Sequence, residues 1–274
     1  MTESIDRRYL GVLKCIDRAT GFHLSQHMRL ESDELSFLRN RSNLYVISKA
    51  IGLEQHSNAF EKAPTLPATG SIAFDVEISD PKHDYLPRTL VIDLPRDADP
   101  ANLDNNNTLF KAIDVQLYAA PKAQIMANWS TVRVSVMRDD GPLGKQPVAA
   151  ALLRVIRESD DEVLSSGLSD QRGEALVIIP GIPITQFADE DEDDGPGGGP
   201  GGGGPPGGGP PGGGNPVPVV ISEIPARLEV SVASGSDWPV NPDLLELNHA
   251  ANLVATESLT LRTGRMEKVA IQLT

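Results

Sequence analysis

A polar turn that leads directly into a short aliphatic strand is the feature that most constrains this chain, and it occurs twice. In residues 167–183 the turn is Ser169-Asp170-Gln171-Arg172-Gly173, followed by an expected strand at 174–179 that Pro180-Gly181 ends. Asp hydrogen-bonds to its own backbone in such turns, Gly tolerates a positive φ, and Pro lacks the N–H that would continue a ladder. A weaker copy, with the turn Arg39-Asn40-Arg41-Ser42, occupies residues 38–47. Two copies of one unit predict two related β-sandwich modules.

The remaining pattern favours strands. Residues 71–79 alternate apolar and polar side chains, residues 227–232 repeat that alternation, and no long amphipathic helix occurs. Short strands separated by turn signals are typical of all-β sandwiches. We therefore predict an all-β fold with a first module at 1–96, a polar linker at 97–108 and a second module at 109–274.

An acidic and Gly/Pro-rich insertion at 189–218 interrupts the second module. Residues 189–194 are all Asp or Glu, and every residue from Gly195 to Gly214 is Gly or Pro. One reading is a disordered, solvated loop, because nothing there buries enough surface to offset ordering. The other is an extended polyproline-II-like or polyglycine segment that pairs with neighbouring subunits. A collagen helix is excluded because Gly does not recur at every third position.

Composition narrows the functional classes. The formal net charge is −14 with a pI near 4.7, which argues against a nucleic-acid or anionic-membrane surface. Cys15 is the single cysteine, and its apolar surroundings predict a buried, inert thiol. The first residues lack an apolar signal core, so we expect synthesis in the cytosol without a signal peptide.

No catalytic, cofactor or metal motif emerges. His23 and His27 lie four apart without a third ligand, and the acidic run lacks the spacing of a calcium loop. His56, His83 and His249 are isolated in polar stretches. We therefore expect no enzyme activity, cofactor or metal. Trp238 beside Pro239 is a candidate contact residue, together with Tyr85, although an anchoring role for Trp238 in a core or module junction is the alternative. Gly195 and Gly214, which bound the Gly/Pro tract, complete the candidate interaction residues.

Residues 131–183 resemble the carboxypeptidase-regulatory or transthyretin-like sandwich. The resemblance rests on Val132-Arg-Val-Ser-Val, Asp139-Asp140-Gly141, the apolar run 148–155 and the 167–180 turn and strand. It implies Ig-like or transthyretin-like sandwich modules.

The whole chain is also similar to accessory proteins of contractile, phage-tail-like injection systems. The similarity rests on residues 39–46, Asp80-Pro81 with Tyr85-Leu86-Pro87, Gly167-Leu-Ser-Asp-x-Arg-Gly and Trp238-Pro239-Val240-Asn241-Pro242. It implies a non-enzymatic structural or adaptor part of the particle's cap, collar or baseplate periphery. The implied partners are sheath, tube or baseplate proteins, or further copies of the chain. The alternative is a free-standing adhesin-like or carbohydrate-binding protein that uses Trp238 and the loop near Tyr85.

Overall fold

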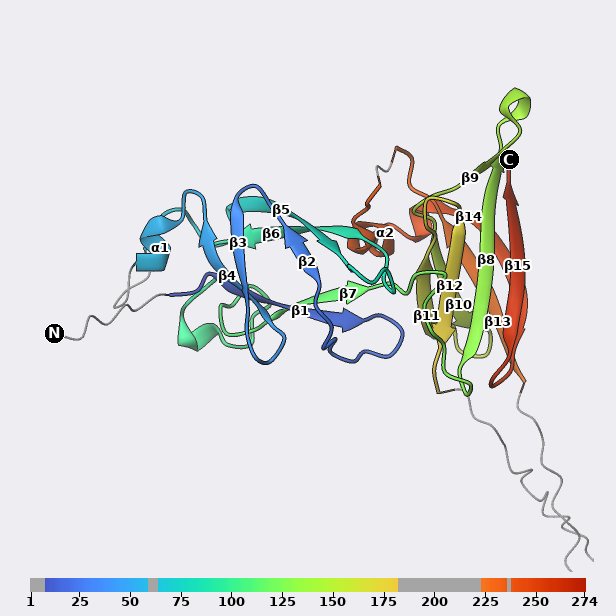
Figure 1. The fold of residues 1–274 in the computed structure, drawn as a ribbon, viewed down its shortest axis with the longest axis horizontal. Helices are drawn as coiled ribbons and strands as arrows, with labels where there is room; N and C mark the ends of the chain where they lie inside the picture. Colours follow the sequence, from blue (N-terminus) through green and yellow to red (C-terminus); the bar gives the residue numbers. More distant parts are fainter. Residues whose placement is uncertain (1–7, 59–63, 182–222, 236–237) are drawn as a thin grey trace, which may run out of the picture.

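The computed structural model describes residues 8–58, 64–181, 223–235 and 238–274, and they are nearly all β (Figure 1). The predicted all-β fold is confirmed. The elements are β1 (Gly11–Asp17), β2 (Arg29–Glu31), β3 (Leu35–Arg39), β4 (Tyr45–Ala50), α1 (Glu54–Asn58), β5 (Ile72–Ser79), β6 (Arg88–Leu94), η1 (Pro100–Asn102), β7 (Ile113–Leu117), β8 (Ser130–Asp139), η2 (Gly141–Leu143), β9 (Lys145–Pro147), β10 (Leu152–Arg157), β11 (Val163–Leu168), β12 (Glu174–Ile179), β13 (Ile224–Ser231), α2 (Pro242–Leu247), η3 (Ala250–Asn252), β14 (Leu253–Leu261) and β15 (Met266–Leu273).

The strands form two modules, each with two sheets around its own apolar core. In the first module, sheets β3-β4-β1-β7 and β2-β5-β6 enclose one core cluster. In the second, sheets β12-β8-β15 and β11-β10-β13-β14 enclose another, and the short β9 pairs with β8. That either module is specifically Ig-like or transthyretin-like stays a prediction.

The two modules share one connectivity. When the short β9 is left out of the count, the first strand of each lies between an antiparallel fourth strand and a parallel last strand: β1 between β4 and β7, and β8 between β12 and β15. The third strand differs, because β3 pairs with β4 in the first module whereas β11 pairs with β10 in the second.

The two turns singled out in the sequence connect the third and fourth strands of their modules and have the same hydrogen bonds. The Asn40 amide oxygen accepts from the N–H groups of Ser42 and Leu44, both at 2.9 Å. An Asp170 carboxylate oxygen accepts from the same relative positions, Arg172 at 2.8 Å and Glu174 at 3.1 Å. The residue three positions after each capping side chain has positive φ, 62° at Asn43 and 74° at Gly173. The weaker sequence copy is therefore a true structural equivalent.

The predicted division into 1–96, 97–108 and 109–274 is wrong at its centre. β7 pairs along its length with β1, so the first module continues to about residue 120. The segment 97–108 is a folded loop of that module, since Arg96 Nε donates to the Thr108 carbonyl at 2.8 Å and Thr108 is fully buried. Its Asp and Asn side chains cap local turns, as Asp99 does for Ala101 N–H, and this gave the loop the composition of a linker.

The alternating strand at residues 71–79 and the buried position of Cys15 agree with the predictions from the sequence. On β5, Val76 is 1% exposed in the first core whereas Glu77 faces solvent. Cys15 is also in that core, and burial raises the pKa of its thiol to about 12. The insertion at 189–218 lies outside the described residues.

Gly173 provides a test of the turn. A Cβ at Gly173 would lie 2.4 Å from the Val136 carbonyl oxygen, whereas one at Gly141, also of positive φ, would meet nothing within 4 Å. We expect Gly141→Ala to cost about 1 kcal/mol from backbone strain alone. Gly173→Ala should cost about 2 kcal/mol more, because the backbone around it must also shift. Urea unfolding of both variants measures the difference, and equal losses would show that the close approach at Gly173 is unimportant.

Candidate functional site at the junction of the two modules

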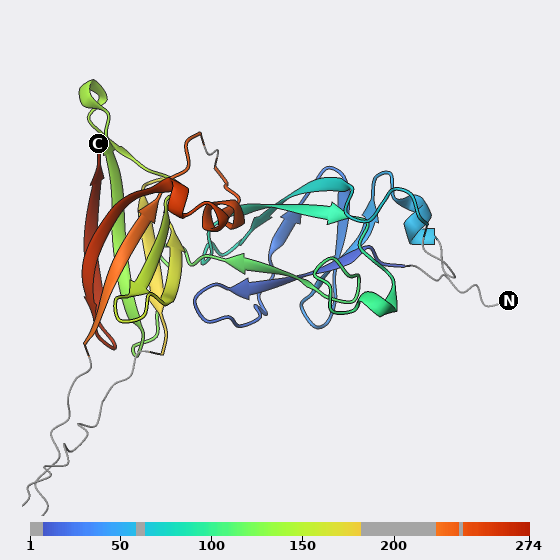
Figure 2. The ribbon, with the colours of Figure 1, turned by 180° about the vertical axis from the view of Figure 1, so that it is seen from behind.

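The end of the first module packs against the outer face of sheet β11-β10-β13-β14. Figures 1 and 2 show the strands of the first module running across the view and those of the second running up it. Because Leu153 faces the second core, its neighbour Leu152 points to the outer face of the sheet. The apolar part of this junction comprises Leu86, Tyr118, Ala120, Ala150, Leu152, Leu168, Val240 and Leu245.

Helix α2 supplies the polar part of the junction. Asn241 is its N-cap and accepts from the Asp243 N–H at 3.1 Å, and Pro242 occupies the first turn, where its missing N–H costs nothing. Two carboxylates, Asp243 and Glu246, follow at a spacing of three and therefore share one side of the helix. Each contacts cationic or hydroxyl groups of the first module.

Arg88 of β6 is the buried partner of Asp243. Its side chain is 1% exposed, and Nη2 lies 2.5 Å from Asp243 Oδ2. The same guanidinium donates to the Gln116 carbonyl at 2.7 Å and to the Thr89 carbonyl at 3.2 Å. Bidentate pairing and two carbonyl acceptors satisfy a charge that would otherwise be costly to bury.

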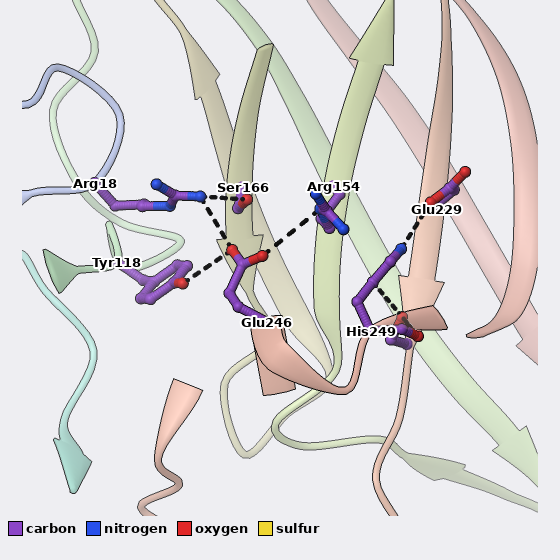
Figure 3. Close-up of polar contacts among 8 residues, drawn as sticks. Arg18, Tyr118, Arg154, Ser166, Glu229, Glu246 and His249 are labelled. Carbon is purple, nitrogen blue, oxygen red and sulfur yellow. Dashed lines mark hydrogen bonds and ion pairs between the residues drawn. The ribbon is translucent and has the colours of Figure 1, made fainter. Parts of the chain in front are cut away.

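Glu246 joins both modules through its two oxygens (Figure 3). Oε1 lies 3.1 Å from Arg18 Nη2 and accepts from the Tyr118 hydroxyl at 3.3 Å, both in the first module. Oε2 lies 3.6 Å from Arg154 Nε of β10. Arg18 also donates to Ser166 on β11 at 3.2 Å. Burial and, next, the Glu246 carboxylate raise the pKa of the Tyr118 phenol, so this donor stays protonated.

A serine, a histidine and a glutamate form a second polar chain, of which Figure 3 labels His249 and Glu229. Ser231 Oγ lies 2.5 Å from His249 Nδ1, and His249 Nε2 lies 2.7 Å from Glu229 Oε2. Hydrolase triads attach serine to Nε2 and the carboxylate to Nδ1, so the order here is reversed. Ser231 is fully buried, and its hydroxyl also reaches the His249 carbonyl at 3.1 Å. This geometry anchors the segment after α2 to β13. His249 is thus a buried, bonded residue, which corrects its interpretation as an isolated loop histidine.

Burial opposes ionisation of Glu229, but hydrogen bonds from Arg227 and His249 outweigh it and leave the pKa of Glu229 below its usual value. Glu229 therefore stays an anionic acceptor for His249. The stability it contributes is present above the usual glutamate pKa and is lost as the pH falls through its lowered value.

Two of the interaction residues predicted from the sequence meet in one cleft beside the junction. Trp238 and Tyr85 line an open cleft of about 320 Å³ together with His83, Lys122 and Arg172. Trp238 also packs against the junction core, as its alternative reading had it, and Pro239 follows it half-buried. The Tyr85 hydroxyl donates to Asp17 at 2.5 Å, and burial and this bond raise its pKa. Gly195 and Gly214 lie outside the described residues.

The residues that hold the junction together were not singled out from the sequence. Arg18 and Arg88 are far from Asp243 and Glu246 in the chain, and nothing local marks any of the four as a junction residue. The one available signal was Asn241-Pro242-Asp243, a helix start with an N-cap, a first-turn proline and an acid. No cluster of three or more potential metal ligands occurs among the described residues, and none of the described helices is long and apolar enough to span a membrane.

We expect the two residues of the Arg88–Asp243 pair to differ in the cost of their removal, because Arg88 is buried whereas the Asp243 side chain is 52% exposed. Asp243→Ala should cost about 3–5 kcal/mol, since it leaves a buried guanidinium without its counter-charge. Arg88→Met should cost about 1–3 kcal/mol, because the remaining carboxylate is hydrated and only hydrogen bonds are lost.

Urea unfolding of the two single variants and the double variant checks this order. We expect the double variant to resemble Arg88→Met, because Asp243 has little left to stabilise once the guanidinium is gone. A larger loss of unfolding free energy for Arg88→Met than for Asp243→Ala would show that an unpaired buried Arg88 is not the more destabilising of the two unpaired charges.

Comparison with known proteins gives no family for the chain. No family model and no curated protein matches it. Among solved structures, the minor pilin GBS52 of Streptococcus agalactiae aligns over 86% of this chain and 65% of its own, with 9% identity and a TM-score of 0.25. The TIE protein of Bacillus anthracis aligns over 96% of this chain and 34% of its own, with 9% identity and a TM-score of 0.24. The chain thus spans less than two thirds of either structure, and similarity of this size leaves the function to be argued from the junction.

Proposed function

We propose that this protein is a non-catalytic structural or adaptor subunit of a contractile, phage-tail-like particle, located at its cap, collar or baseplate periphery. It is made in the cytosol and assembles with sheath, tube or baseplate proteins. The sequence resemblance supports the kind of particle. The observation that carries the structural role is the junction, whose charged groups bond to one another across the two modules.

The charged groups at the junction are used within the protein. Asp243 and Glu246 are committed to three arginines and a tyrosine, and the Ser231–His249–Glu229 chain is bonded internally. Groups used in this way fix the orientation of one module on the other. A fixed pair of sandwiches presents its outer surfaces at a constant spacing, which suits a part that bridges neighbouring subunits.

The test is sedimentation of tail-like particles from cells that express the chain. We expect the chain in gradient fractions that contain sheath and tube, detected with a specific antibody. Asp243→Ala should reduce its share in those fractions because the two modules lose their fixed orientation, whereas Asp93→Ala, which removes an exposed carboxylate on β6, should not. A chain that stays at the top of the gradient while particles sediment normally would overturn the proposal.

Deletion of residues 195–214 tests, in the same assay, whether the Gly/Pro segment attaches the protein to neighbouring subunits, as its composition suggested. We expect normal urea unfolding, because shortening a loop changes stability by only about 1 kcal/mol, but reduced incorporation. Full incorporation of the deletion variant would show that the segment is a passive loop.

The cleft that contains Trp238 and Tyr85 favours a second candidate, an adhesin-like or carbohydrate-binding protein. An indole face beside Arg172, Gln171 and Lys122 offers a stacking surface with hydrogen-bond donors, the combination that sugar sites use. We expect glycan-array binding by the full chain that Trp238→Ala abolishes. Because Trp238 also packs on the junction, Gln171→Ala is the second variant, and it should weaken the same glycans severalfold. No binding, or binding unchanged in both variants, would reject this candidate.

A further inference from the structure

The second module leaves two long strand edges without a partner. β14 is the last strand of sheet β11-β10-β13-β14, and β15 is the last strand of sheet β12-β8-β15. They follow each other in the chain, have nine and eight residues, and pair in the described part of the chain only with β13 and β8, respectively. A free edge presents a row of backbone N–H and C=O groups to which another strand can add.

Several other edges among the described residues are short, irregular or covered. β2 has three residues, and its two ends, Arg29 and Glu31, are charged and exposed. β3 is interrupted by a register shift after Ser36, and β12 is almost entirely buried. One end of β6 is occupied by the second module, because the Thr89 N–H donates to the Val240 carbonyl at 2.9 Å. β14 has none of these protections along residues 255–261, where its register with β13 is continuous.

The side chains of β14 define what this edge would accept. Ala255 and Leu259 pack on the second core, so Glu257 shares their face by the period of two. Val269 on β15 also packs on that core, which places Glu267 on the corresponding face. A groove of about 410 Å³ lies between the edges, lined by Leu259, Val269 and Glu267 and also by Lys268 and Arg262, of which Arg262 is paired with Glu223. Glu257 and Glu267 make no ion pair with any described residue.

These carboxylates disfavour a second copy of the chain as the occupant. A symmetric antiparallel pairing of β14 that keeps both cores on one side must place Glu257 opposite itself or opposite an apolar residue of the same face, such as Ala255 or Leu259. The first choice opposes like charges and the others leave the carboxylate without a counter-charge. The net charge of −14 adds repulsion between copies. The edge is therefore complementary to a cationic strand.

We propose that the free edge of β14 binds an extended segment of a partner protein, which adds as a fifth strand and places a Lys or Arg opposite Glu257 between apolar side chains. This deepens the proposed function, because strand addition would attach the adaptor without a pocket. The backbone pairing provides general affinity, and the charge opposite Glu257 selects the partner.

The probes are two fluorescein-labelled peptides, Thr-Val-Thr-Lys-Thr-Val-Thr and the same peptide with Glu in place of Lys, titrated with the full chain by anisotropy. We expect the Lys peptide to bind at least fivefold more tightly, and Glu257→Lys to reverse that order. Glu77→Lys is the matched control, because Glu77 is equally exposed but lies on β5, which is paired on both sides, and it should leave the preference unchanged.

Hydrogen exchange gives the location. Amides of residues 254–260 should become protected when the Lys peptide is added, while those of β2 should not. Absence of saturable binding, a preference that does not follow residue 257, or protection elsewhere would overturn the proposal, as would dimerisation of the chain through β14 in sedimentation velocity. Peptide binding without particle association would reject the proposed function and keep the strand site. Particle association without peptide binding would keep the proposed function and reject the strand site.

Discussion

The buried guanidinium of Arg88 is the constraint on which the arrangement of the two modules depends. A charge that is 1% exposed must keep its acceptors, and these come from Gln116 and Thr89 of its own module and from Asp243 of the other. The carboxylate is the only one of these that neutralises the charge. Separation of the modules would therefore expose Arg88 to solvent or leave it buried without a counter-charge. The hydrogen bonding and charge of Arg88 are satisfied only while α2 stays in place.

Helix α2 consequently belongs to the second module by its place in the chain, but its ion pairs and hydrogen bonds also tie it to the first module. It lies in the connection from β13 to β14, and its Glu246 contacts Arg18 and Tyr118 on one side and Arg154 on the other. His249 anchors the end of the same segment to Ser231 and Glu229. A helix of only six residues has little stability of its own, so these contacts are what keep it folded.

Local features of this structure could be predicted from the sequence, and long-range ones could not. The Asn40 and Asp170 turns and the faces of β5 depend on neighbouring residues, and the pattern identified them correctly. The placement of β7 beside β1 depends on a pairing about 100 residues apart, and short apolar alternation does not say which sheet a strand joins. The burial of Arg88 and the contacts of Glu246 are set by the docking of one module on the other, and the burial of His249 by the packing of its segment on β13. The adhesin-like alternative paired Trp238 with the loop near Tyr85, and the structure places both residues in the lining of one cleft.

The difference between the modules in their third strand explains why the junction forms where it does. In the second module, β11 pairs with β10 and widens that sheet to four strands, and this adds Ser166 and Leu168 to the outer face that receives the first module. In the first module, β3 pairs with β4 instead, so the equivalent sheet β2-β5-β6 is narrower. The first module and α2 cover part of the wide face, whereas the far edge of the same sheet, β14, pairs with no further described strand. Docking of the modules therefore uses one face of this sheet, and the edge at β14, whose one charge, Glu257, makes no ion pair among the described residues, is left for the partner strand.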